Sequence, residues 1–428
     1  MTKARVPMGA VSWLGFDKQD SSSGIGQEAA CPDAVVVGGS VAGLGVARSL
    51  STAGASVLVL DASRFNAALW SRHCAGGVIA EVSGRPLIDE LKLLARGFAK
   101  PPLLVLTQDA AVEAVSQWRA ELEPFYRFLL PSEQTVDLLN DKGRFHEFAT
   151  QEGFPVPRGV VVSAVRDIAA LDLMVAPVVV KPVRKSVLQD SGLDRAMRFD
   201  SMSDAKAHCA ALLKLNTGAI VQRWVEGPDH SIYFCLFFCD GAGQSLRIFT
   251  GRKLSAYPPR VGSTATCVAA APEIGAKLEA LTVRLTTRVK FAGMGGLEFK
   301  RNEITGKFVI IEPTVGRTDW QEEIATLSGI NIPMAALAFA SGQPVGSTAA
   351  DPGPIAWRTS LRHRAPRALR RVGVKIVDGY WRADDPVPGL IFYAVEPVRR
   401  LINRGLSAVR SNSVGRPFNP KQKLPLRG

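Results

Sequence analysis

Two glutamates, Glu298 and Glu312, occupy opposed positions in a predicted β-hairpin. Residues 295–301 and 308–314 are strand-length, mostly apolar runs, and Gly306 suits the left-handed position that closes a three-residue hairpin loop. A loop of that length places Glu298 directly opposite Glu312, where two like charges repel. A hard divalent cation between them would reverse this repulsion, since Mg²⁺ takes carboxylate oxygens together with substrate phosphates. The spacing therefore predicts a metal site for phosphate chemistry.

The hairpin alone also allows a second interpretation, a surface hairpin with two solvated glutamates. A shift of one residue in the pairing would put the two side chains on opposite faces. Two lysines favour the metal site. Lys142 lies on a predicted helix over residues 136–152, and Lys181 ends a predicted buried strand, where an ammonium can reach a phosphate as a point charge.

Further polar residues follow in an order that suits a nucleotide. Residues 219–227 predict a strand that runs into a hinge, whose backbone groups could meet a flat base. Arg252 and Lys253 open a predicted basic loop, and Arg317 follows the hairpin. Lysines for phosphates, a hinge for the base and two carboxylates for Mg²⁺ are the groups that phosphoryl transfer requires.

In this order of motifs the chain resembles the ATP-grasp superfamily, in particular its carboxylate–amine ligase branch of predicted carboligases and D-aspartate-ligase-like proteins. The resemblance covers about residues 34 to 345. The matching motifs are Asn140-Asp141-Lys142, Val180-Lys181-Pro182, Val221-Gln222-Arg223-Trp224-Val225-Glu226-Gly227, Gly296-Leu297-Glu298-Phe299-Lys300 and Ile311-Glu312-Pro313-Thr314-Val315-Gly316-Arg317.

The resemblance implies a role for each matching residue. Lys142 and Lys181 would bind phosphate. The adenine hinge would be Gln222, Arg223, Trp224 and Val225, with Asp229 toward the ribose. Mg²⁺, or Mn²⁺ in its place, would be held by Glu298, Glu312 and Thr314. Developing negative charge would be stabilised by Lys253 or Arg252, together with Arg317. The chain departs from the family pattern at Thr314, which stands where an asparagine is usual, and at Gly316, which displaces the arginine to position 317.

The implied fold is α/β and α+β: a doubly wound N-terminal (pre-ATP-grasp) domain followed by a two-lobed ATP-grasp fold. We expect a disordered leader at residues 1–30, the first domain at 31–131, the ATP-grasp domain at 132–345 and a basic extension at 346–428. The implied reaction joins a small-molecule carboxylate to an amine through an acylphosphate and releases ADP and phosphate.

A glycine turn at residues 38–43 supports a different class of function. It follows a buried strand and precedes a helix and a second strand ending at Asp61, as in flavin- or nicotinamide-binding oxidoreductases. Ser40 stands where that fingerprint requires glycine, which weakens this alternative. Ligands bind beyond the carboxyl ends of parallel strands, so a cleft edge could include Ser40, Ser71, Arg72 and Asp109. A third alternative is an ATP-binding module without turnover, motivated by Thr314.

Composition narrows the class of protein. The chain has 428 residues, 46% of them hydrophobic and 21% charged, as is typical of a soluble globular protein. Of the net charge of +13, most belongs to residues 355–428, which contain 16 Lys or Arg and 4 Asp or Glu. A nearly neutral body argues against nucleic-acid binding. Six widely spaced cysteines indicate free thiols in a reducing cytoplasm. Residues 388–410 predict a basic amphipathic helix, which could lie on an anionic membrane or pack on the body.

Overall fold

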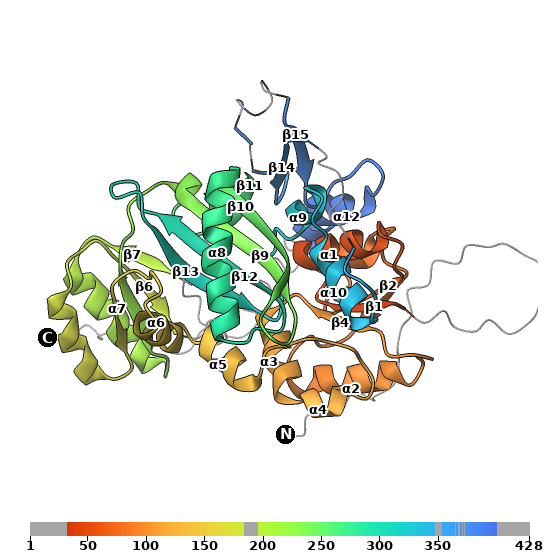
Figure 1. Ribbon diagram of the computed structural model, residues 1–428, viewed down its shortest axis with the longest axis horizontal. Coiled ribbons are helices and arrows are strands. Elements are labelled where there is room, and N and C mark those ends of the chain that lie inside the picture. Colours follow the sequence, from red (N-terminus) through yellow and green to blue (C-terminus); the bar gives the residue numbers. More distant parts are fainter. Residues whose placement is uncertain are drawn as a thin grey trace, which may run out of the picture.

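The computed structural model contains three β-sheets with helices packed against them (Figure 1). It describes residues 32–183, 196–346 and 353–399, apart from 364, 367, 368, 370 and 372. The predicted leader at residues 1–30 lies outside the described residues, as does the second half of the predicted basic helix.

The first sheet is all parallel and has the strand order β3-β2-β1-β4. Its strands are β1 (Ala34–Val37), β2 (Val57–Asp61), β3 (Gly76–Ile79) and β4 (Leu103–Leu106). Val35 and Val37 belong to the core that contains α2 (Gly84–Ala95) and α3 (Asp109–Gln117), whereas Ala34 and Val36 pack on the side of α1 (Val41–Ser51) and α10 (Ile332–Ala340). Burial on both faces explains why β1 is a continuous apolar run. The short elements η1 (Ala67–Trp70) and α4 (Arg119–Leu122) complete this region.

The second sheet is small and antiparallel, with the order β5-β8-β6-β7. It consists of β5 (Gly159–Val162), β8 (Ala219–Arg223), β6 (Val178–Pro182) and β7 (Met197–Phe199), with η2 (Val165–Leu173) and α7 (Met202–Lys214) in its core.

The prediction of a single helix over residues 136–152 is wrong. Two helices occur instead, α5 (Glu133–Asn140) and α6 (Lys142–Gln151). Asp141 has an extended backbone between them, and its carboxylate accepts the N–H groups of Gly143 and Arg144, both at 3.0 Å. This cap satisfies amides at the start of α6 and makes Lys142 its first residue.

The third sheet has seven strands in the order β13-β12-β9-β10-β11-β14-β15. Its strands are β9 (Ile232–Cys239), β10 (Ser245–Tyr257), β11 (Ser263–Ala269), β12 (Gly293–Arg301), β13 (Phe308–Val315), β14 (Ile355–Arg358) and β15 (Lys375–Asp378). β9 is buried on both faces, between α8 (Pro272–Arg288) on one side and α9 (Glu323–Leu327) with α10 on the other (Figure 1). Because β10 is 13 residues long, Arg252 and Lys253 lie on a strand and not in the predicted loop.

The hairpin of β12 and β13 contains an irregularity that the sequence did not predict. Four residues, not three, separate Asn302 from its partner Lys307, and Gly306 has a φ of +67°. That loop alone would shift the pairing by one residue. A β-bulge at Ile311 shifts it back, so that Glu298 pairs with Glu312. The predicted loop length is wrong and the predicted pairing of the two glutamates is confirmed.

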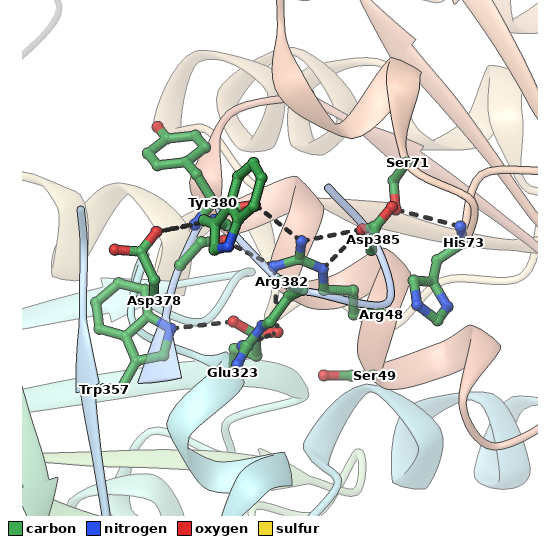
Figure 2. A network of polar contacts seen from close by, with 12 residues as sticks. Arg48, Ser49, Ser71, His73, Glu323, Trp357, Asp378, Tyr380, Arg382 and Asp385 are labelled. Carbon is green, nitrogen blue, oxygen red and sulfur yellow. Dashed lines mark hydrogen bonds and ion pairs between the residues drawn. The ribbon is translucent and has the colours of Figure 1, made fainter. Parts of the chain in front are cut away.

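The C-terminal segment joins the body of the molecule. β14 pairs with β11, and β15 pairs with β14. The segment then reaches α1 through a buried polar network (Figure 2). Arg48 of α1 donates to the Asp385 carboxylate at 2.9 Å and to the carbonyl oxygens of Gly379 and Tyr380 at 2.8 and 3.1 Å. Two short helical elements, α12 (Val387–Leu390) and η5 (Ile391–Val395), follow this network.

Other partners complete the network. Asp385 also accepts the Ser71 hydroxyl at 2.7 Å and the Arg72 N–H at 3.0 Å. Ser71 and Arg72 therefore bind the C-terminal segment and do not form the edge of an open cleft. On the far side of Arg48, Glu323 accepts the indole N–H of Trp357 at 3.0 Å and pairs with Arg382 at 2.7 Å (Figure 2).

The neighbouring Glu322 makes stability depend on pH. It is fully buried, and burial, followed by the charge of Glu323, raises the pKa of its carboxyl to about 8. Between pH 4.5 and 8 the folded chain keeps a proton that the unfolded chain has lost, so the free energy of unfolding falls as pH rises. Because of this carboxyl, we expect the free energy of unfolding to fall by roughly 3 kcal/mol between pH 4.5 and pH 7. Glu322→Gln should remove this contribution to the pH dependence of the free energy of unfolding. Urea unfolding of both proteins at several pH values measures it. Identical slopes would contradict the prediction.

The described cysteines are free thiols, as expected: Cys74, Cys209, Cys235, Cys239 and Cys267. Burial raises the pKa of the Cys74 thiol to about 11 and that of Cys235 to about 12, which makes both poor nucleophiles. Among the described residues, no helix has the length and apolarity needed to cross a membrane.

Candidate active site

One cavity brings together most of the residues that the sequence analysis predicted for the site. It is lined from the small sheet and the large sheet at once, by residues of β6 and β8 on one side and of β10, β12 and β13 on the other. Eleven of the thirteen predicted site residues line it: Lys142, Lys181, Gln222, Arg223, Trp224, Val225, Lys253, Glu298, Glu312, Thr314 and Arg317. Separate elements therefore converge on one concave site, which is where ligands bind in most proteins.

The two opposed glutamates are each paired with a lysine. Glu298 accepts the ammonium of Lys253 at 2.5 Å, and Glu312 lies 3.3 Å from the ammonium of Lys142. The repulsion from which the sequence predicted a metal ion is thus offset by the chain's own cations. Both carboxylates keep 26% of their side-chain surface exposed to the cavity and solvent. Among the described residues, no three His, Cys, Asp or Glu side chains gather as a metal site.

Lys253 and Arg317 remain charged although both are buried. Burial by itself lowers the pKa of Lys253, but the charge and hydrogen bond of Glu298 outweigh it, so the net pKa is raised. For Arg317, burial is opposed mainly by Asp109, whose carboxylate accepts the guanidinium at 2.7 Å, and the pKa is again raised. Asp109 is the first residue of α3, beside the first sheet. The N-terminal region therefore positions an arginine of the cavity.

The predicted hinge consists of the last two residues of β8 and the two residues that follow it. The N–H groups of Arg223 and Trp224 donate to the carbonyl oxygens of Arg158 and Pro177 at 2.8 and 3.0 Å. In the described part of the chain the N–H of Val225 has no hydrogen-bond partner. Since Val225 lines the cavity, this group is available to a ligand with an acceptor in its plane.

The sequence analysis missed Lys300 as a cavity residue. Its ammonium lies 4.2 Å from the centroid of the Trp224 ring, a cation–π distance. Burial lowers the pKa of Lys300, although the charge of Asp229 acts in the opposite direction. Alternation along a strand could have identified it, because Lys300 is two residues from Glu298 and so shares its face of β12.

Two predicted residues, Asp229 and Arg252, do not line this cavity. The Asp229 carboxylate accepts the N–H groups of Ala256 and Arg260 at 2.9 and 2.8 Å, so it holds the loop after β10. Arg252 donates to the carbonyl oxygen of His230 at 2.6 Å, within the short helical turn η4 (Asp229–Ser231). The structure thus places both side chains against backbone groups, and their predicted roles toward ribose and substrate stay predictions.

The protein's own atoms occupy the space around the glycine turn at residues 38–43. Gly38 has a φ of +100°, and a Cβ at Gly43 would lie 1.8 Å from the Gly38 carbonyl oxygen. Asp61 is buried, and its carboxylate accepts the N–H of Gly39 at 2.6 Å. In dinucleotide-binding folds the corresponding acidic residue binds a ribose. Here Asp61 closes the turn, which does not favour the oxidoreductase alternative.

Comparison with known proteins gives structural relatives only. No protein-family model and no curated protein sequence matches the chain. The solved structures that are similar include N5-carboxyaminoimidazole ribonucleotide synthetase from Thermus thermophilus, at 20% identity and a TM-score of 0.58, covering 78% of this chain and 85% of that one. The biotin carboxylase domain of Hydrogenobacter thermophilus 2-oxoglutarate carboxylase, solved with MgADP and bicarbonate, has 15% identity and a TM-score of 0.58, covering 74% and 71%. N5-carboxyaminoimidazole synthase from Aspergillus clavatus, solved with ADP and 5-aminoimidazole ribonucleotide, has 14% identity and a TM-score of 0.57, covering 76% of this chain and 80% of that one.

Proposed function

We propose that this chain, which has the ATP-grasp fold of these enzymes, is an ATP- and Mg²⁺-dependent ligase that joins a carboxylate to an amine. The observation that carries the proposal is the convergence of eleven predicted site residues on one cavity. In support of it, two of the three similar structures named above contain ADP, one of them as its magnesium salt. We also infer that the N-terminal parallel sheet is the doubly wound domain that precedes the grasp proper, with boundaries near residues 131 and 345.

In the first step a carboxylate oxygen of the substrate attacks the γ-phosphorus of ATP. The bond from that phosphorus to the bridging oxygen breaks, and ADP leaves with its electron pair. Lys142 and Lys181 neutralise phosphate charge, and the Val225 N–H meets the adenine edge beside Trp224. The product is an acylphosphate.

In the second step a neutral amine nitrogen attacks the acyl carbon. The bond to the phosphate oxygen breaks, phosphate leaves with the electron pair, and the amine proton passes to solvent. Arg317, held by Asp109, and Lys253, held by Glu298, remain cationic and offset the charge that develops on the acyl oxygen. Fixed charges placed where charge develops are often the largest contribution to catalysis.

The residues present fit a magnesium ion bound between protein and nucleotide. Mg²⁺ usually takes one or two carboxylates together with substrate phosphates, and Glu298 and Glu312 provide two partly exposed carboxylate side chains. Thr314, which lines the same cavity, adds a hydroxyl. When bound there, the ion supplies positive charge to the phosphate oxygens.

A phosphate-release screen tests the proposal. The purified protein is incubated with ATP, MgCl₂ and pairs of carboxylates and amines, with bicarbonate included among the carboxylates. We expect ADP and phosphate to appear only when both substrates are present. Nucleotide binding without turnover in any pair would favour the non-catalytic module instead. A thermal shift with FAD or NAD but not with MgADP would overturn the proposal in favour of an oxidoreductase.

Thr314 allows a separate test of the metal site. A side-chain amide oxygen is a stronger ligand than a hydroxyl for a hard cation, so Thr314→Asn is expected to lower the Mg²⁺ concentration needed for half-maximal ADP binding by roughly three- to tenfold. Isothermal titration calorimetry at several Mg²⁺ concentrations measures this. Thr314→Val, which removes the hydroxyl at similar volume, is the matched control. If Asn and Val behave alike, Thr314 does not face the ion.

A further inference from the structure

The last helical segment of the described chain exposes only apolar side chains to solvent. It runs from Pro386 to Arg399 and includes α12 and η5. Its two charged residues, Glu396 and Arg399, pair with each other at 2.7 Å. Its exposed residues are Val387, Leu390, Ala394, Val395 and Val398. A helix at a protein surface normally turns charged and polar residues toward water, so this outer face requires another explanation.

The inner face of the same segment is packed on the body of the molecule. The Phe392 ring stacks on the Tyr380 ring, with the two centroids 3.7 Å apart. The Tyr393 hydroxyl donates to the Asp378 carboxylate at 3.1 Å and accepts the N–H of Leu361 at 2.6 Å. These contacts fix the rotation of the segment about its axis. The apolar side chains on the outer face therefore cannot turn inward without breaking them.

The large exposed side chains lie along one line, which we call the C-terminal apolar strip. Each has between 37% and 56% of its surface exposed, and the members are Trp381, Val387, Leu390, Val395 and Val398. The four in the helical segment follow one another at steps of three, five and three positions. The step of five crosses η5, a turn of π-helix, in which residues five apart are joined by hydrogen bonds. A Cβ at Gly389 would lie 2.7 Å from the Trp381 ring, so this ring packs on α12 beside the other four.

Positive charge lies beside the strip and follows it in the sequence. Arg362 is exposed, and its guanidinium lies 5.6 Å from the centroid of the Phe392 ring. Residues 399–428 contain eight Lys or Arg and no Asp or Glu. One exposed carboxylate, Asp384, precedes α12. The apolar spacing of the strip also continues in the sequence beyond the described residues, at Leu401, Ile402, Leu406 and Val409.

An anionic membrane surface suits both the strip and the charge that follows it. Apolar side chains enter the boundary between headgroups and acyl chains, and nearby Lys and Arg residues are attracted to anionic lipids. A second copy of this chain would bring its own positive segment to the contact, where like charges repel. A nucleic acid would match the positive charge but leave the apolar side chains in water.

We infer that the C-terminal apolar strip lies in the headgroup region of an anionic lipid membrane, to which the basic residues of 399–428 attract it. The inference concerns where the protein is held, and it does not depend on the proposed ligase reaction. The residues that line the cavity all lie between Lys142 and Asp319. None of them belongs to the strip, so membrane contact would use a separate surface.

Sedimentation with vesicles tests the inference on the full chain. Vesicles of phosphatidylcholine with about 30 mol% phosphatidylserine are compared with vesicles of phosphatidylcholine alone. We expect the anionic vesicles to bind the protein at least about tenfold more tightly, and this binding to weaken at least about tenfold as NaCl is raised from about 50 to about 500 mM. No binding to the anionic vesicles at low salt would overturn the inference.

Substitutions in the strip connect this binding to its apolar side chains. Leu390→Ser with Val398→Ser is expected to weaken binding to the anionic vesicles roughly tenfold or more, because two apolar side chains no longer leave water. Val165→Ser with Leu173→Ser is the matched control. These two side chains, on η2, are 74% and 75% exposed, and their loss should leave binding unchanged. Native binding in the Leu390 and Val398 variant would overturn the inference, because charge alone would then explain the attraction.

Tryptophan fluorescence reports directly whether the strip reaches the acyl chains. Lipids with brominated acyl chains quench an indole only on contact. We expect anionic vesicles that contain them to quench part of the protein's fluorescence, and Trp381→Phe to remove that part. Equal quenching of both proteins, or none of either, would contradict insertion of the strip.

The competing occupants give different results. Polyuridylic acid that binds the protein, with no vesicle binding, would replace the membrane by a nucleic acid. A dimer in sedimentation velocity that the Leu390 and Val398 substitutions dissociate, again with no vesicle binding, would replace it by a second copy of the chain. Either result would overturn the inference, and neither would affect the proposed ligase function, which phosphate release tests separately.

Discussion

Glu312→Gln is expected to lower ATP-dependent phosphate release by about 100- to 1,000-fold, the effect of removing one group that stabilises the transition state. The amide keeps the shape of the side chain but loses the charge that faces Lys142 and that the proposed metal site requires. A partly exposed ion pair contributes only about 0–1 kcal/mol, so the free energy of unfolding should change little. Steady-state phosphate release and urea unfolding measure the two quantities separately.

Glu303→Gln is the matched control for this variant. Glu303 lies in the loop of the same hairpin and is exposed, and the amide oxygen can still accept the Ser231 hydroxyl. We expect nearly native turnover from it. Native turnover in Glu312→Gln would exclude Glu312 from the metal site. Equal losses in both variants would show that the hairpin, and not the carboxylate, is responsible.

Asp385→Asn is expected to lower the free energy of unfolding by about 3–5 kcal/mol, because it leaves a buried arginine without its main counter-charge. Arg48 and Asp385 are 5% and 2% exposed, and Asp385 also accepts the Ser71 hydroxyl (Figure 2). It accepts the backbone N–H of Arg72 as well. The remaining acidic partner of Arg48, Glu323, is 3.6 Å away and already shared with Arg382. Urea unfolding at constant pH measures the loss.

Asp384→Asn removes the same charge one residue earlier, from an exposed side chain, and should change stability by less than about 0.5 kcal/mol. The double variant Arg48→Met with Asp385→Asn should be less destabilised than the two single losses added together, because the two groups interact directly. Additive losses, or similar losses for Asp384 and Asp385, would contradict the role assigned to this pair.

The cavity and the buried network around Arg48 of α1 differ in how far their carboxylates are exposed. In the cavity, the carboxylates of Glu298 and Glu312 stay partly exposed, which suits the proposed contacts with an ion and a nucleotide. In the α1 network, charges are buried and every acidic group has several donors, which makes the network a connection between the C-terminal segment and the first sheet. Mutations at the first site should change turnover, and mutations at the second should change stability.

Local patterns in the sequence determined a large part of this protein. A continuous apolar run identified β1 because a strand buried on both faces needs no polar residue. The mostly apolar runs on either side of Gly306 likewise identified β12 and β13. The motif residues of the cavity lie within or next to α6, β6, β8, β12 and β13, so the surroundings of each could be inferred from a few adjacent residues.

Only the tertiary structure decided how those elements meet. The bulge at Ile311, the pairing of Asp109 with Arg317 and the attachment of Asp385 to Arg48 each join residues whose partners are chosen by packing. Asp109 and Arg317 are 208 positions apart, and Arg48 and Asp385 are 337 apart, so no local pattern records either pair. The sequence gives the sign of each charged side chain. Its partner is decided by which helices and strands pack against one another and exclude water from the space between them.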